Sequence, residues 1–223
     1  MTQLLAVIRI AAAALVIAVS LPFLIAAGFL RLRWKGVYLA SWIVRLTTLC
    51  YLFIFNVRLT CPEPERLRRH RGLIVANHVS YLDIIMLTAI HPVRFLSAME
   101  VKERPVIGWL AAAAGSVFVE RSDLRSKRNA VVSIVEQYQS EPEPPIGIFP
   151  EGRLGTGDRV FPFQLGVFKM AIRNDIPYLV CAIRYDRPDI AVWHGRRGES
   201  MLAALWRSAS FRGPLHAMVI PIE

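Results

Sequence analysis

The stretch LIVANHVSYLD, residues 73–83, determines how the rest of the chain is interpreted. Its first residues, Leu73 to Ala76, form a short apolar run that is typical of a fully buried strand. Polar side chains follow at once, among them His78 and Asp83, and the apolar run IIMLTAI comes after them. This change of pattern predicts a strand that presents an imidazole at the edge of a sheet and is followed by a helix.

The spacing between His78 and Asp83 limits how the two side chains can meet. On one continuous helix, five residues advance about 500°, which leaves the side chains roughly 140° apart. They can meet if His78 lies in the turn after the strand and Asp83 lies in the first turn of the helix. An aspartate in that place holds one imidazole tautomer and favours the imidazolium.

The same stretch contains no obvious protein nucleophile, so the attacking group is expected to be a hydroxyl of the substrate. The alternative is a solvent-facing histidine capped by local polar residues, because short motifs often match by chance. A metal-dependent hydrolase, with His78 and Asp83 as ligands, is a second alternative, weakened by the lack of further clustered His or Asp residues. A third is a non-catalytic scaffold on a lipid surface.

The composition points to a membrane. The 223 residues suffice for one domain, or for one domain plus an anchor. Hydrophobic residues make up 54% of the chain, and the excess lies at the N-terminus. The net charge of +10 would suit nucleic acid, anionic lipid or a phosphorylated substrate. The apolar N-terminus favours lipid, and no zinc-finger or RNA-recognition signature supports a nucleic-acid partner.

The cysteines indicate a reducing environment. Cys50, Cys61 and Cys181 are odd in number and have no CxxC or Cys/His ligand spacing. This pattern predicts neither a structural disulfide nor a zinc site, and it fits a cytoplasmic setting. No metal and no resident cofactor are expected.

Residues 1–51 are predicted to form a membrane anchor of two helices. No residue from Ile10 to Leu30 is charged, and about 20 apolar residues suffice to span a bilayer. The basic cluster RLRWK at residues 31–35 favours the cytoplasmic side. A second apolar segment, Val37–Tyr51, contains Arg45, so it is expected to lie in the interface or to re-enter the membrane. The alternative for the first segment is a secretory signal peptide.

Residues 52–223 alternate between strand-like and helix-like segments. Residues 53–60, FIFNVRLT, have the alternation of an edge strand, and the charged residues 62–71 are predicted to be a connecting loop. Further strands are expected at 93–98, 116–119, 146–149, 178–183 and 215–220, with helices near 82–90, 105–113, 124–138, 165–173 and 199–208. This order predicts an α/β domain with a mostly parallel central sheet flanked by helices.

Four sequence blocks, in order, carry a family resemblance. NHVSYLD, residues 77–83, resembles the first signature of the membrane glycerolipid acyltransferases of the lysophosphatidic acid acyltransferase type, NHxSxxD. The segment 101–122 is similar to the second block, FPEG at 149–152 to the third, and IPYLVCAIR at 176–184 to the fourth. The resemblance covers roughly residues 50–220, and four ordered blocks are stronger evidence than one motif.

The resemblance implies an O-acyltransferase that moves a fatty acyl group from acyl-CoA or acyl carrier protein to the free hydroxyl of a lysolipid. The expected reaction converts lysophosphatidate to phosphatidate at the cytoplasmic face of a bacterial-type inner membrane. His78 would act as general base, Asp83 would orient it, and His78 would return the proton to the thiolate. Backbone N–H groups near Gly152 or Val79 are candidates for stabilising the oxyanion.

The resemblance also implies a set of residues that bind substrate. Arg121 is the candidate for the acceptor phosphate, because a guanidinium engages two oxygens at once. The other members of the set are Asn77, Ser80, Lys102, Glu151, Gly152 and Arg153. Arg153 and Leu154 stand where the family commonly has Thr followed by Arg or a small polar residue. This departure leaves another lysolipid, such as a lyso-ornithine lipid, as the alternative acceptor.

Overall fold

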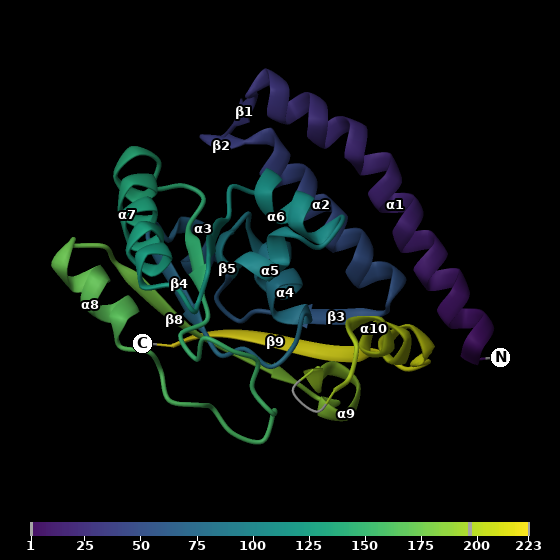
Figure 1. The fold of residues 1–223 in the computed structure, drawn as a ribbon. Helices are drawn as coiled ribbons and strands as arrows, with labels where there is room; N and C mark the ends of the chain where they lie inside the picture. Colours follow the sequence, from purple (N-terminus) through teal and green to yellow (C-terminus); the bar gives the residue numbers. More distant parts are fainter. Residues whose placement is uncertain (1, 196–197, 223) are drawn as a thin grey trace.

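The computed structural model of this protein describes residues 2–195 and 198–222. A seven-stranded sheet with the order β3-β9-β8-β4-β7-β5-β6 lies at its centre (Figure 1). The strands are β3 (Val57–Thr60), β4 (Leu73–Ala76), β5 (Arg94–Ala98), β6 (Val117–Val119), β7 (Ile146–Ile148), β8 (Tyr178–Tyr185) and β9 (Leu215–Ile222). In this sheet β8 and β9 are antiparallel and the other neighbouring pairs are parallel. The predicted α/β fold with a mostly parallel sheet is therefore confirmed.

Helices cover both faces of the sheet. Both faces need cover because the apolar side chains of the central strand point alternately to one face and to the other. Ile74 and Ala76 of β4 belong to one core cluster, and Leu73 and Val75 belong to the other. The first face carries α2 (Leu39–Ile54), α4 (Leu82–Ile90), α9 (Pro188–Ala191) and α10 (Met201–Ser210). The second face carries α7 (Leu124–Ser140) and α8 (Gly166–Arg173), and the short helices α5 (Met99–Lys102) and α6 (Ile107–Ala113) follow β5.

The N-terminal segment forms a helical hairpin that packs on this domain. Its first helix, α1 (Thr2–Leu30), has the length and apolarity needed to cross a membrane. The two short strands β1 (Arg33–Trp34) and β2 (Val37–Tyr38) then reverse the chain. As a result α2 returns along α1, and Leu24 and Ala27 contact Ala40 and Val44 in a small apolar cluster.

The other end of α1 is tied to α10. The guanidinium of Arg9 is buried, and its Nη1 donates to the carbonyls of Ala209 at 3.1 Å and Phe211 at 2.5 Å. These carbonyls belong to the last turn of α10 and the residues after it, where no further helical N–H groups are available to them. The first helix is therefore anchored to the domain near both of its ends.

Two predicted boundaries are wrong. Residues 53–60 were expected to form an edge strand, but α2 continues to Ile54 and only Val57–Thr60 are extended, paired with β9 at the sheet edge. A short apolar run fits a helix or a strand equally well, and here the helix buries Leu52 in the core. The predicted loop at 62–71 contains α3 (Pro64–Arg69), which begins with a proline and buries Leu67 completely.

Candidate active site

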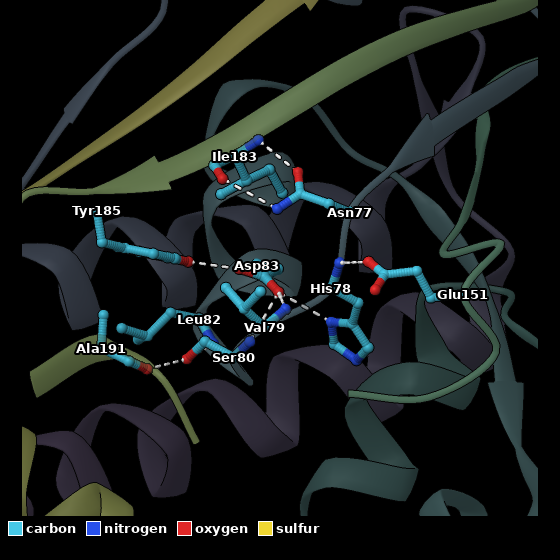
Figure 2. A network of polar contacts seen from close by, with 10 residues as sticks. All are labelled: Asn77, His78, Val79, Ser80, Leu82, Asp83, Glu151, Ile183, Tyr185 and Ala191. Carbon is cyan, nitrogen blue, oxygen red and sulfur yellow. Dashed lines mark hydrogen bonds and ion pairs between the residues drawn. The ribbon is translucent and has the colours of Figure 1, made fainter. Parts of the chain in front are cut away.

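His78 and Asp83 meet where β4 passes into α4, as the sequence predicts (Figure 2). Because β4 ends at Ala76 and α4 begins at Leu82, His78 lies in the turn and Asp83 lies in the first helical turn. Nδ1 of His78 is 2.9 Å from Oδ2 of Asp83. An ionised carboxylate only accepts hydrogen bonds, so Nδ1 carries the proton and Nε2 of the neutral ring has a free lone pair.

The Asp83 carboxylate also holds the turn that carries His78. Its side chain is 0% exposed, whereas that of His78 is 16% exposed. Oδ2 accepts from the backbone N–H of Val79 at 2.7 Å and of Ser80 at 2.9 Å. The Tyr185 hydroxyl donates to the other oxygen, Oδ1, at 2.7 Å. These donors offset the cost of burying the charge, and they fix the imidazole and its turn as one unit.

Asn77 and Ser80 were predicted to bind substrate, but the structure shows both with intramolecular partners. The Asn77 amide bridges to β8, donating to the Ile183 carbonyl at 3.1 Å and accepting the Ile183 N–H at 2.7 Å. The fully buried Ser80 hydroxyl donates to the carbonyl of Ala191 at 2.5 Å. Through these contacts both residues position the turn, and their contact with the substrate stays a prediction.

Glu151 supports the same turn from the opposite side. One carboxylate oxygen accepts the His78 N–H at 2.9 Å, and the other accepts the Phe161 N–H at 2.9 Å. Glu151 is only 4% exposed. The neighbouring Phe149 ring stacks on the imidazole with 4.0 Å between ring centroids. The resemblance associates Glu151 with acceptor binding or with positioning of the site, and these contacts support the positioning role.

We expect Glu151→Gln to lower the turnover rate about tenfold and the free energy of unfolding by about 1–3 kcal/mol. The amide retains one acceptor for the His78 N–H but points a donor at the Phe161 N–H. Steady-state rates and urea unfolding of the purified variant test this. Glu120→Gln is the matched control, because Glu120 accepts the Ser122 N–H at 3.2 Å on the surface and should change little. A Glu151→Gln enzyme with the parental rate would contradict the positioning role.

A groove of about 280 Å³ lies between α7 and α8 at the carboxyl ends of β6 and β7, and it reaches the third block. Arg121 and Lys127 supply its charged groups. The rest of its wall is mostly apolar and includes Ala130, Ile134, Ile148, Phe149, Gly152, Val167 and Met170. Phe149 lines the groove and also stacks on His78, whereas His78 is not itself one of the lining residues. Its shape and lining suit a molecule with an apolar chain and an anionic group.

The predicted substrate-binding residues are thus only partly brought together. Arg121 and Gly152 line the groove, but Lys102 and Arg153 are not among its lining residues. The Lys102 Nζ lies 5.7 Å from the centroid of the Phe118 ring. The Arg153 guanidinium lies 4.5 Å from the centroid of the Phe161 ring. Arg121 is therefore the predicted cation that the structure places in the groove.

The oxyanion site was expected near Gly152 or Val79, and the N–H groups of these two residues themselves are already used within the protein. The Val79 N–H donates to Asp83, and the Gly152 N–H donates to the Phe149 carbonyl at 3.0 Å. Gly152 adopts a positive φ of 65° in this turn, which a glycine tolerates without steric cost. Neither N–H is free to receive an oxyanion in this conformation.

Two contributors were not identified from the sequence. Tyr185 ends β8, and Lys127 lies in the first turns of α7, outside the blocks that carry the resemblance. For Tyr185, the only available signal was its place at the carboxyl end of a strand that lies beside β4. Among residues 2–195 and 198–222, no three His, Cys, Asp or Glu side chains gather in the manner of a metal site.

Comparisons with known proteins agree with this architecture. The Acyltransferase family matches residues 58–184. The chain is 34% identical over 127 residues to a 1-acyl-sn-glycerol-3-phosphate acyltransferase of Neisseria gonorrhoeae, covering 56% of this chain and 47% of that protein. It is 34% identical over 149 residues to a lyso-ornithine lipid O-acyltransferase of Pseudomonas aeruginosa, covering 67% of this chain and 54% of that protein. The chain thus spans about half the length of these relatives.

A solved structure shows the same fold over the whole chain. The crystal structure of the 1-acyl-sn-glycerophosphate acyltransferase of Thermotoga maritima superposes with a TM-score of 0.69 at 18% identity. It covers 100% of this chain and 87% of the other. Because the family match includes the His78 turn, the Glu151 turn and most of β8, this chain belongs to the Acyltransferase family.

Proposed function

We propose that this protein transfers a fatty acyl group from an acyl thioester to the free hydroxyl of a lysolipid, with lysophosphatidate as acceptor and phosphatidate as product. The observation that carries the proposal is the His78 imidazole, which Asp83 holds in one tautomer and which stacks on Phe149, a lining residue of a groove that suits an amphiphile. The matched relatives act on 1-acyl-glycerol-3-phosphate and on lyso-ornithine lipid, which supports a lysolipid as the acceptor class.

The geometry supports the following proton path for this reaction. Nε2 of His78 removes the proton of the acceptor hydroxyl while the hydroxyl oxygen attacks the thioester carbonyl. Asp83 stabilises the imidazolium that forms, because its Oδ2 faces Nδ1. When the tetrahedral intermediate collapses, the carbon–sulfur bond breaks and the thiolate takes the proton from Nε2. The products are the acylated lipid and the free thiol, and His78 returns to its neutral form.

The acceptor is assigned to the groove next to Phe149. Its apolar wall between α7 and α8 would take an acyl chain, and Arg121 would bind the phosphate. A lyso-ornithine lipid is the second candidate, because Leu154 supplies no cation at the position after Arg153 and a relative acts on that lipid. The donor is acyl-CoA or acyl carrier protein.

The membrane assignment rests on the N-terminal hairpin. We propose that residues 1–51 anchor residues 52–223 to a bacterial-type inner membrane. Arg31, Arg33 and Lys35 follow α1, and basic residues beside an apolar helix favour the cytoplasmic face.

One assay tests the proposed function. The full chain, purified in detergent, receives a long-chain acyl-CoA and either lysophosphatidate or a lyso-ornithine lipid, with a chelator present. Release of free thiol together with formation of the diacylated lipid by mass spectrometry is the expected result. Loss of activity on chelation would instead support a metal-dependent hydrolase, and no turnover with any lysolipid or donor would reject the transferase.

We expect Arg121→Ala to raise the KM for lysophosphatidate at least about tenfold with a smaller change in kcat, because a charge-assisted contact to phosphate is lost. Initial rates over a range of acceptor concentrations measure this. Arg125→Ala is the matched control, since Arg125 is exposed two residues into α7 and does not line the groove. Equal effects of the two substitutions would mean that Arg121 acts only through the overall charge.

A further inference from the structure

We propose that Tyr185 is a positioning residue for the reaction: its hydroxyl donates to the Asp83 carboxylate, shares its negative charge, and so keeps His78 a base. The inference rests on the proposed function, in which the neutral imidazole accepts the proton of the acceptor. Tyr185 lies one residue beyond the family match and outside the four blocks of the resemblance.

The two oxygens of Asp83 have different partners (Figure 2). Oδ2 accepts from Nδ1 of His78 and from the two N–H groups of the turn. Oδ1 accepts from the Tyr185 hydroxyl at 2.7 Å. Tyr185 therefore contacts the carboxylate from the side that His78 does not reach.

Strand pairing explains why Tyr185 reaches this carboxylate. β8 runs parallel to β4 with Ala76 opposite Cys181, so β8 continues beyond the point where β4 ends. The chain after β4 turns into α4 at the same edge, and the side chain of Tyr185 extends over that turn toward Asp83 (Figure 2). The sheet therefore supplies a rigid support for a contact to the first turn of α4.

The hydroxyl is held in its donating form. Burial, followed by the negative charge of Asp83 and the hydrogen bond to it, raises the pKa of Tyr185 well above its usual value. The other titratable groups that act on it are Tyr81, beside α4, and Tyr51 of α2, and both raise the pKa further. Glu151 lies across the turn, where it accepts the His78 N–H. Tyr185 is therefore protonated throughout the pH range in which an imidazole titrates.

A donor on Oδ1 shares the negative charge of the carboxylate. In Tyr185→Phe this donor is lost, and more of the charge is concentrated on Oδ2, which faces Nδ1. The imidazolium is then favoured, so less of the ring is in the neutral form that accepts a proton. We expect the acidic limb of the kcat/KM profile to move up by about one pH unit and kcat to fall about tenfold. The KM for the acceptor should stay within about twofold, because Tyr185 does not line the groove.

Tyr51→Phe is the matched control. The Tyr51 hydroxyl contacts the Tyr81 hydroxyl at 3.1 Å, so its removal costs one side-chain hydrogen bond in the same region without touching Asp83. This variant is expected to keep the parental pH profile even if its stability falls. A shift of the same size in both variants would show that Tyr185 has only a structural role.

The decisive readout does not require turnover. In protein with isotope-labelled histidine, the ring resonances of His78 are identified by their loss in His78→Ala and are then followed against pH by NMR. The midpoint for His78 should be about one unit higher in Tyr185→Phe than in the parent and in Tyr51→Phe. An unchanged or lower midpoint overturns the inference. If the parent lacks acyl transfer but the midpoint moves, the proposed function fails and the positioning role stands.

Discussion

His78→Ala is expected to lower the rate of acyl transfer about 10²- to 10⁴-fold while leaving the fold intact. The substitution removes the group that takes the proton from the acceptor hydroxyl and returns it to the leaving thiolate. The side chain of His78 is partly exposed, so its loss leaves no large cavity. Thiol release and product formation with saturating acceptor and donor measure the rate, and far-UV circular dichroism with a thermal unfolding curve reports on the fold.

The chain contains a matched control for this variant. Nδ1 of His216 is 2.8 Å from Oδ2 of Asp186, so the same pair of residue types occurs on the surface, remote in sequence from the His78 turn. His216→Ala should retain at least about half of the parental rate, because loss of an exposed pair is worth at most about 1 kcal/mol of stability. If His78→Ala keeps the rate of His216→Ala, the imidazole has no role in the chemistry and the proposed mechanism is wrong.

Asp83→Ala is expected to have the largest combined effect, with activity near that of His78→Ala and a free energy of unfolding lower by about 3–5 kcal/mol. The completely buried carboxylate accepts from the imidazole, two backbone N–H groups and Tyr185. Alanine leaves all of these donors without an acceptor, and the turn that carries His78 loses its support. Urea unfolding with linear extrapolation measures the change in stability.

Two further variants separate the roles of Asp83. Asp186→Ala removes the exposed carboxylate of the control pair and should cost less than about 1 kcal/mol. Asp83→Asn keeps an oxygen that accepts from Val79 and Ser80 but lacks the charge. It should therefore recover much of the stability while its activity stays up to about 10⁴-fold below the parent. Full activity in Asp83→Asn would show that the carboxylate serves only to shape the turn.

Much of the fold was predictable because its signals are local. The apolar run before His78 indicated β4, and the alternation of segments after it indicated a mostly parallel α/β sheet. The predicted helix at 82–90 agrees with the bounds of α4. The errors occurred where local patterns are ambiguous, as in the apolar residues 53–54, which continue α2, and in the charged residues of α3, where only Leu67 is buried.

The His78–Asp83 contact belongs to the local part of the site. Both residues lie in one strand–turn–helix unit, so their spacing in the sequence is enough to bring them together once β4 ends before His78. Each of the four blocks and the apolar N-terminal segment could likewise be identified from the sequence, because each consists of residues close to one another along the chain.

Only the tertiary structure decided which groups surround that pair. Tyr185 is 102 residues from Asp83, and Glu151 is 73 residues from His78, yet both make direct hydrogen bonds to this turn. They do so because β4 lies between β7 and β8, so that the segments leaving all three strands meet at one edge of the sheet. Strand order depends on how the whole core packs, and the partners of buried polar atoms depend on strand order. Neither the strand order nor these partners can be inferred from the pattern of residues along one segment.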